Sequence, residues 1–435
     1  MTDIAIISAC ILVYSLVSGR LGKTIVTAPI LFVAAGILLG PSLLDWTDLQ
    51  AASKPTELLA EVTLALILFN DAALIDWPSL RRNRDTPFRL LAIALPLIMI
   101  GGAFAAALLV PGIKIWQAAL VGVILAPTDA AVGQAVVTNK RVPKRIRQSL
   151  IVESGLNDGM AAPLVAIFIA ASGISGAVGS DSSWVTFIAK ELGYGLLIGA
   201  GIGLASAVLI GRLSQWGWIA HTYEQIAIAA VPVVAFAFAT LLEGNGLIAA
   251  FIAGIAFGNI ARQLDVRVFR FSEESASVLM LVTFFIFGAV MVDPALDALS
   301  WQIVVYALVS LAVIRPAFVA LSMLGTGFRP PTLAFIGWFG PRGIASIVFA
   351  LQVIGTKGLP GSAEIAVVVT WTVLLSIVAH GITAQPGAGW YADRSEEIVE
   401  DDEEAPEGDE VEDFFRQAAS MAVGDQPLGP TDSPN

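Results

Sequence analysis

Apolar runs of about 16–25 residues, almost free of charge, recur along the whole chain. A helix of that length crosses a bilayer core of about 30 Å. Because lipid offers no hydrogen bonds to the backbone, such runs must satisfy their own backbone groups, and the α-helix does so. The composition agrees, since only 14% of the residues are charged, against about 25% in soluble domains. We therefore predict an all-α polytopic membrane protein.

Thirteen apolar runs, each bounded by charge, proline or glycine, are the predicted spans. They cover residues 3–18, 24–40, 57–76, 88–109, 112–137, 146–172, 184–210, 223–242, 245–260, 276–292, 300–323, 332–352 and 363–385. Lys and Arg concentrate in cytoplasmic loops. Loops after odd-numbered spans contain sixteen of these residues, and loops after even-numbered spans, together with the start of the seventh span, contain four. This alternation supports the count and predicts a multi-pass protein of the cell membrane with the N-terminus outside and the C-terminus in the cytoplasm.

The acidity of the chain belongs to its C-terminal end. The formal net charge is −12, but residues 393–435 alone contain fifteen acidic residues and two arginines, so the rest is nearly neutral. A segment this acidic and this rich in Pro and Gly cannot bury a core. We predict a transmembrane domain over residues 1–390 and a disordered cytoplasmic tail over 391–435. The tail either only solvates the protein or docks on the basic loop 140–147.

Several ionisable residues fall inside predicted spans, where a charge costs at least about 2.5–3.5 kcal/mol to insert. They are Asp129, Glu153, Asp158 and Arg342, together with Asp71 and Arg315, for which a structural ion pair is an equal alternative. In the segment ESGLNDG, Glu153 and Asn157 are i, i+4 neighbours on one helix face. Ser154 and Asp158 share the adjoining face. Oxygen ligands of this kind suit a small, hard cation.

Two spans contain predicted helix breaks. In APTDAAV, Pro127 removes a backbone hydrogen bond and disfavours helix just before it, which frees carbonyl groups near Thr128. In GPRGIAS, Pro341 and two glycines break the twelfth span around Arg342. That arginine can neutralise a carboxylate such as Glu153 or cap the broken helices. The two spans are seven apart and therefore antiparallel. Such paired breaks are typical of inverted-repeat secondary transporters with a site near the bilayer midplane.

At these residues the sequence resembles the monovalent cation/proton antiporter superfamily, and within it the sodium/proton exchanger (NhaP-like) branch with an Asn-Asp motif. The resemblance covers nearly all of the predicted transmembrane domain. It rests on APTDAAV, ESGLNDG, GNGLIAAFIAGIAFGN, the Arg315–Pro316 pair, GPRGIAS and AHGITAQPGAGWYADR. It implies a homodimer, with a core domain from about residues 57–172 and 276–385 that moves like an elevator against a dimerisation domain built from the remaining spans.

The resemblance also implies roles for individual residues. Asp158 would be protonated and cation-bound in turn, and Asn157, where electrogenic relatives have a second aspartate, would bridge to Thr128. The implied cation ligands are Asp158, Thr128, Asp129, Ser154 and Glu153, and the implied site-organising residues are Asn157, Arg342, Pro127 and Pro341, with Glu153 paired with Arg342. An Asn-Asp pair implies electroneutral exchange of one H⁺ for one cation, Na⁺ or Li⁺, in pH homeostasis. K⁺/H⁺ exchange is the alternative.

Other function classes fit the residues less well. A channel would need a filter-like loop of carbonyl groups, and the sequence shows none. An intramembrane hydrolase would need a nucleophile and a base, but both histidines, His221 and His380, lie at span ends, where we expect solvated loop residues. Acidic residues at the breaks disfavour anion transport, although Arg342 leaves it open. We expect no enzyme activity, no cofactor and no nucleic-acid partner; the partners are a monovalent cation, H⁺ and the lipid bilayer.

Overall fold

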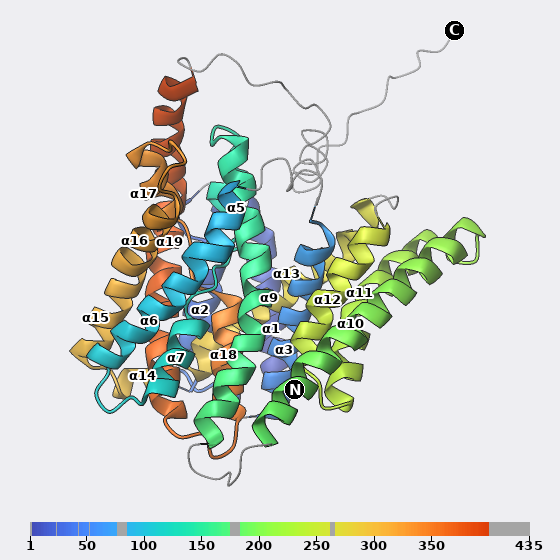
Figure 1. Ribbon diagram of the computed structural model, residues 1–435, viewed down its shortest axis with the longest axis horizontal. Helices are drawn as coiled ribbons and strands as arrows, with labels where there is room; N and C mark the ends of the chain where they lie inside the picture. Colours follow the sequence, from blue (N-terminus) through green and yellow to red (C-terminus); the bar gives the residue numbers. More distant parts are fainter. Residues whose placement is uncertain are drawn as a thin grey trace.

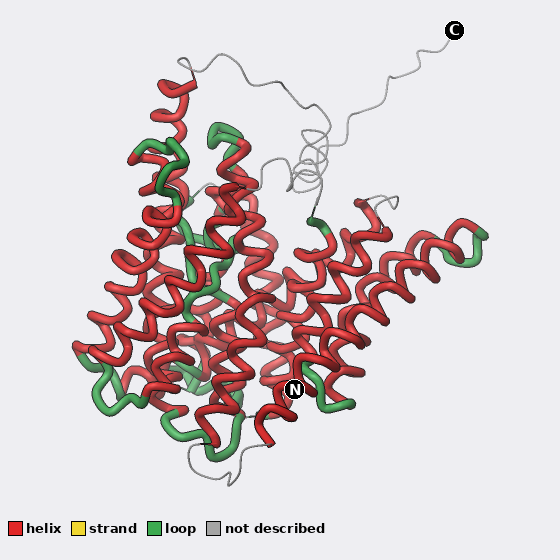
Figure 2. Tube along the Cα trace, in the orientation of Figure 1, coloured by secondary structure: helices red, strands yellow, loops and turns green. Residues whose placement is uncertain are grey.

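The computed structural model describes residues 2–399 except 23, 42, 52, 76–84, 175–182 and 262–265. Within these residues the chain is helical and contains no strand (Figure 2). Eight of the described helices are long and apolar enough to cross a membrane, and four shorter apolar helices accompany them. Each of the thirteen predicted spans coincides with a helix or an interrupted helix, which confirms the predicted fold class.

Nine of the predicted spans are single helices. They are α1 (Thr2–Leu21), α2 (Ala28–Leu39), α3 (Lys54–Ala73), α9 (Lys144–Ile174), α10 (Ser183–Gln215), α11 (His221–Leu241), α12 (Gly246–Ile260), α13 (Arg270–Val290) and α19 (Ser362–Val399). The predicted boundary between body and tail, at residue 390, lies inside α19. Most of the predicted acidic tail, residues 400–435, lies outside the described residues.

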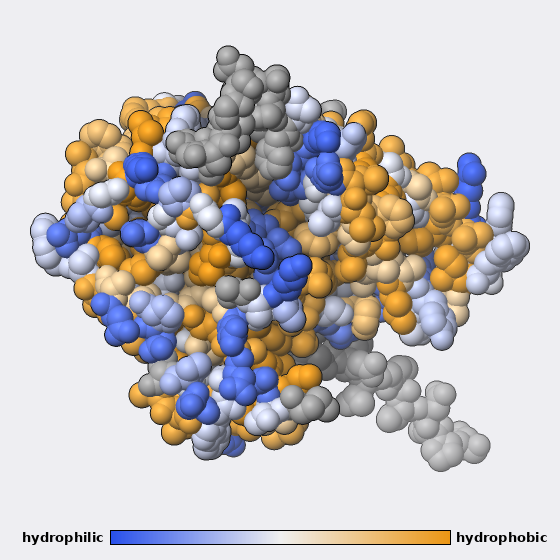
Figure 3. Space-filling model, turned by 90° about the horizontal axis from the view of Figure 1, so that it is seen from below, coloured by the Kyte–Doolittle hydropathy of each residue, from blue (hydrophilic) through white to orange (hydrophobic). Residues whose placement is uncertain are grey.

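The outer surface of the helices is apolar. Large hydrophobic side chains are exposed on α1, α6, α10 and α11, and α1 buries none of its residues. Figure 3, a view onto one end of the helices, shows hydrophobic residues along much of the rim and hydrophilic residues across the end face. Exposed apolar surface on this scale marks contact with lipid, as the multi-pass prediction requires.

Two spans contain a π-helical turn that ends two residues before a proline. The fourth span consists of α5 (Asp85–Arg89), η1 (Leu90–Ala94) and α6 (Leu95–Leu109), and the eleventh of α15 (Trp301–Val309), η4 (Ser310–Ile314) and α16 (Arg315–Ser322). Pro96 and Pro316 are the second residues of α6 and α16. A proline within a helix lacks the N–H and its ring clashes with the preceding turn; a widened π turn accommodates both. These spans are seven apart, so the same distortion recurs in both halves.

Helix contacts repeat with the same offset. α2 packs on α13, and α3 packs on α12. α12 and α13 are the ninth and tenth spans, seven after α2 and α3, so each contact is the counterpart of the other. Both crossings use glycine: Gly36 lies against the backbone of Phe285, and Gly254 lies against the backbone of Phe69, with no space for a Cβ atom at either glycine. Small residues allow helices to approach this closely in membranes. The two halves are therefore inverted repeats, as the sequence predicts.

Figure 1 shows the arrangement around the interrupted spans. α15, α16, α17 and α19 lie at one edge of the bundle, and α10 and α11 lie at the opposite edge, with α3, α9 and α13 between them. α9 contacts both sides, because it packs on α7 and α18 as well as on α3 and α12. The segment ESGLNDG of α9 therefore lies in the interior of the bundle.

Candidate functional site

The fifth and twelfth spans are interrupted where they meet. The flanking helices are α7 (Ile115–Ile124) and α8 (Gln134–Thr138) in one span, and α17 (Pro330–Trp338) and α18 (Ile344–Gly355) in the other. The non-helical segments contain Pro127 and Pro341, so both predicted breaks are present. The backbone N–H of Asp129 donates to the carbonyl oxygen of Pro341 at 2.8 Å, which ties the two segments together.

Asp129 caps the start of α18. Its Oδ2 accepts a hydrogen bond from the N–H of Ile344 at 2.9 Å, and its Oδ1 accepts one from the N–H of Ala131 at 2.8 Å. A carboxylate at a helix N-terminus satisfies an otherwise unpaired N–H and interacts favourably with the helix dipole. Gly343 is required here, because a Cβ atom at that position would collide with the Asp129 carboxylate.

Arg342 satisfies the carbonyl end of α7. The guanidinium is fully buried and donates to the carbonyl oxygens of Ala126 at 2.8 Å and Pro127 at 3.1 Å. Its own N–H donates to Ser376 Oγ of α19 at 2.6 Å. Of the two roles open to Arg342 from the sequence, the structure shows the capping of a broken helix. Asp129 and Arg342 thus place a negative group at a helix start and a positive group at a helix end.

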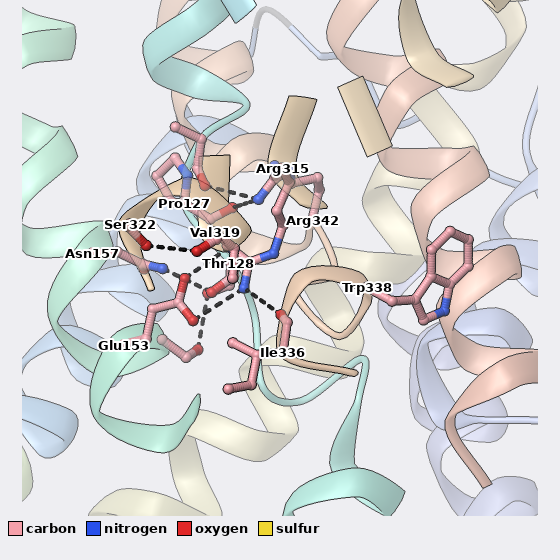
Figure 4. Close-up of polar contacts among 12 residues, drawn as sticks. Pro127, Thr128, Glu153, Asn157, Arg315, Val319, Ser322, Ile336, Trp338 and Arg342 are labelled. Carbon is pink, nitrogen blue, oxygen red and sulfur yellow. Dashed lines mark hydrogen bonds and ion pairs between the residues drawn. The ribbon is translucent and has the colours of Figure 1, made fainter. Parts of the chain in front are cut away.

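Glu153 pairs with Arg315, and the predicted pairing with Arg342 was wrong (Figure 4). The Arg315 guanidinium donates to Glu153 Oε1 at 2.7 Å and to Oε2 at 3.0 Å, a bidentate geometry. Both side chains are almost fully buried, at 2% and 1% exposure. Arg315 has space because Gly340 lies against the guanidinium, where no Cβ atom fits. Because Arg315 already neutralises Glu153, this carboxylate needs a cation less than an unpaired one does, and its role as a cation ligand stays a prediction.

Two polar residues of α9 bind the first break. Asn157 Nδ2 donates to Thr128 Oγ1 at 2.8 Å, the contact that the family resemblance implied (Figure 4). Ser154 Oγ donates to the carbonyl oxygen of Thr128 at 2.9 Å and accepts from the N–H of Ala130 at 2.9 Å. The backbone groups freed by Pro127 thus find partners on α9, which fixes the helix against the crossing.

Asp158 differs from the other buried acidic residues. Its side chain is 7% exposed, and Oδ1 is buried without a hydrogen-bond partner among the described residues. Glu153 has an arginine and Asp129 has two backbone amides, but Asp158 has neither. A buried polar atom without a partner loses its solvation without compensation, and an ionised carboxylate loses most. Asp158 is therefore the group at the crossing that most needs a proton or a cation.

Asp71, which the sequence left open between a structural and a functional role, lies beside this group. Asp71 is an exposed residue of α3. Gly155 of α9 provides the space for it, because a Cβ atom at Gly155 would be 3.0 Å from Asp71 Cβ and 3.5 Å from Oδ2. Asp71 and Asp129 both interact electrostatically with Asp158. Like charges repel, so this grouping adds to the need for a positive partner.

A small cavity adjoins the crossing. Its volume is about 20 Å³, enough for roughly one water-sized particle. The lining includes Thr128, Asp129, Ser154, Phe339 and Pro341. The space thus lies between the two breaks and the polar face of α9, where hydroxyl, carbonyl and carboxylate oxygens meet.

Comparison with known proteins identifies the family. The model of the family described as "Sodium/hydrogen exchanger, transmembrane" matches residues 6–389. The chain belongs to the sodium/hydrogen exchanger family. The chain is similar to the K(+)/H(+) antiporter NhaP of Alkalimonas amylolytica, with 26% identity over 381 residues that cover 87% of this chain and 64% of that protein. The K(+)/H(+) antiporter NhaP2 of Shewanella sp. (strain MR-4) is 27% identical over 404 residues, 88% of this chain and 65% of that protein. The chain thus spans slightly less than two thirds of the length of these relatives.

A solved structure shares the fold of this chain. The sodium proton antiporter MjNhaP1 from Methanocaldococcus jannaschii at pH 8 superposes with a TM-score of 0.72 at 19% sequence identity, and the match covers 90% of this chain and 100% of that one. The predicted membership of the NhaP-like branch is confirmed.

One polar residue near the crossing of the exchanger was assigned wrongly from the sequence. His380 was expected in solvent at a span end, but it is 1% exposed inside α19. Nε2 lies 2.9 Å from the carbonyl oxygen of Trp338 at the end of α17, and Nδ1 lies 3.1 Å from Ser376 Oγ, the group that binds Arg342. His380 therefore supports the second break. Its position four residues after Ser376 on one helix face is the signal that could have revealed it.

Proposed function

We propose that the protein is a secondary active antiporter that exchanges one monovalent cation for one proton at Asp158. The observation that supports this most strongly is the state of that carboxylate, whose Oδ1 is buried and without a hydrogen-bond partner among the described residues. At the same crossing Glu153 is paired with Arg315, and Arg342 donates to two carbonyl oxygens. An unpaired ionised group in this position is unfavourable. Either a proton or a cation relieves the cost, and one site cannot hold both.

Competition for one carboxylate yields coupled exchange. If the site switches its access from one side of the membrane to the other only when Asp158 is neutralised, neither ion crosses without the return of the other. Mass action then requires that a tenfold rise in proton concentration increases the half-saturating cation concentration, by up to about tenfold where the proton occupies the site. Asn157 carries no charge and its amide binds Thr128, so this position adds no second titrating group beside Asp158, which favours electroneutral exchange.

The cation ligands that we propose are oxygen atoms beside the crossing. Asp158 and Asp71 supply carboxylates, and Thr128 and Ser154, which line the small cavity, supply neutral oxygens. Asp129 can contribute a remaining lone pair, since its two oxygens each accept one hydrogen bond. A set of oxygen ligands suits a hard cation. We propose Na⁺, with Li⁺ as a second substrate, because the cavity is small; K⁺ is the second candidate, because two similar proteins are named K(+)/H(+) antiporters.

The mode of movement and the assembly are part of the same proposal. We propose an elevator-type motion of the helices around the crossing in a homodimer, with the N-terminus outside and the C-terminus in the cytoplasm of the cell. The excess of Lys and Arg in alternate loops supports this orientation. The inverted repeat of the two halves supports alternating access, since each half supplies one interrupted helix.

Purified protein in sealed proteoliposomes with an internal pH dye tests the function. Inward gradients of Na⁺, Li⁺ or K⁺ should each be compared with a Cl⁻ gradient and with a clamped membrane potential. We expect a cation gradient to drive proton efflux that the potential does not alter. Asp158→Asn should abolish the flux, and Asp297→Asn, an exposed acid on α14 (Val292–Asp297), should leave it intact. Flux that follows Cl⁻, or that survives in Asp158→Asn, would refute the proposal.

A further inference from the structure

A groove on the outside of the bundle shares one lining residue, Phe339, with the small cavity at the crossing. It runs between α17 and α19, at the edge of the molecule in Figure 1, and has a volume of about 390 Å³, within the size range of ligand pockets, about 300–1,000 Å³. Ala334, Trp338 and Phe339 line one side, and Thr383, Gly387 and Trp390 line the other. The groove opens outward, since Ala334 and Trp390 are exposed.

The wall of the groove presents hydrocarbon. Trp338 Nε1 donates to Thr383 Oγ1 at 3.0 Å, so these two polar groups satisfy one another within the wall. An apolar space of this kind does not hold ordered water. On α19 the lining positions 383, 387 and 390 form one stripe, which extends for about 10 Å at a rise of 1.5 Å per residue. One leaflet of a bilayer core measures about 15 Å, so the groove fits within a single leaflet.

A positive charge lies at the C-terminal end of this stripe. Arg394 is one turn beyond Trp390, and its guanidinium lies 4.8 Å from the centroid of the Trp390 ring. Arg394 is exposed, and the neighbouring Asp393 pairs with Arg141. An exposed guanidinium can make a bidentate contact with a phosphate. Tryptophan and arginine together are characteristic of the level of the lipid headgroups.

We propose that the groove between α17 and α19 binds a phospholipid, with one acyl chain along the groove and the phosphate on Arg394. The chain then contacts Phe339, the residue that follows α17 and begins the second break. Gly387 makes this possible, because a Cβ atom there would collide with the Phe339 ring. The bound lipid thereby supports the second break through Phe339, which also lines the small cavity at the crossing. The assignment depends on the groove and on Arg394, and holds whichever ion the protein transports.

Native mass spectrometry of the full-length protein tests the site, with dioleoylphosphatidylglycerol as the probe. Ala334→Trp fills the groove from an exposed position, and its matched control, Ala107→Trp, adds the same bulk to an exposed position on α6. We expect wild type and the control to retain one phosphatidylglycerol more than Ala334→Trp. Arg394→Gln should lower the affinity about fivefold, the effect of one basic residue near an anionic headgroup, whereas Arg212→Gln at the exposed end of α10 should not.

Three results would overturn parts of the assignment. Equal retention of phosphatidylglycerol by Ala334→Trp and wild type would show that the groove does not hold the lipid. Equal retention of dioleoylglycerol, which lacks the phosphate, together with an unchanged affinity of Arg394→Gln, would remove the headgroup contact. Retention of lipid only after the chain is shortened to Val399 would show that residues 400–435 occupy the groove instead.

Discussion

The Glu153–Arg315 ion pair makes a quantitative prediction about stability. Removing one partner of a buried pair leaves an uncompensated charge, which costs about 3–5 kcal/mol. Arg315→Met and Glu153→Met should each destabilise the protein by that amount, since both side chains are almost fully buried and their contact is bidentate. The double variant Glu153→Met/Arg315→Met has no buried charge left at this position. A similar apolar pair is often neutral or stabilising, so most of the loss should be recovered.

Equilibrium unfolding in mixed detergent micelles, with melting curves as a second readout, measures these differences. A third variant distinguishes the two arginines. Glu153→Met/Arg342→Met should be less stable than either single variant, because Arg315 stays unpaired and the carbonyl oxygens of Ala126 and Pro127 lose their donor. Recovery of stability with Arg342→Met, and not with Arg315→Met, would refute the pairing and restore the expectation from the sequence.

Three further substitutions address the crossing. Thr128→Val removes the hydroxyl that accepts from Asn157 and should cost about 1–3 kcal/mol for the buried amide left unsatisfied, measured by unfolding, while Thr128→Ser keeps the contact and should restore both stability and exchange. Gly343→Ala forces a Cβ atom into the carboxylate that caps α18 and should strongly reduce exchange. Its control, Gly133→Ala, should be tolerated, because the Cβ atom would lie 3.5 Å from its nearest neighbour. Equal activity of the two alanine variants would contradict the capping role. Asp71→Asn should retain exchange but raise the half-saturating cation concentration several-fold in the liposome assay; an unchanged value would remove Asp71 from the site.

Much of the fold follows from local physical chemistry. Long uncharged runs can only be helices in lipid, so all thirteen spans appear in the structure. Proline acts on its own turn, so Pro127 and Pro341 indicated the two breaks without any knowledge of the packing, whereas Pro163, Pro232 and Pro386 lie inside continuous helices. The bridge from Asn157 to Thr128 required the family resemblance as well, because it joins residues 29 positions apart on two spans.

Contacts between distant spans could not be predicted in the same way. Glu153 had two buried arginines as potential partners. The packing brings Arg315 to Glu153, and Gly340 leaves the space for the Arg315 guanidinium. Asp71 lies at the site because α3 packs on α9 beside Gly155, a contact with no signal in the sequence. His380 was placed in solvent because the predicted last span ended at residue 385, whereas α19 continues to Val399 and buries it.

Proton release on cation binding tests most directly whether the two ions compete for Asp158. Calorimetric titration of the purified protein with Na⁺ and K⁺, in buffers that differ in ionisation enthalpy, counts the protons released per cation bound. We predict a release that rises towards one proton per chain as the pH falls, and no release from Asp158→Asn. Cation binding to wild type without proton release, or an undiminished release from Asp158→Asn, would contradict the assignment.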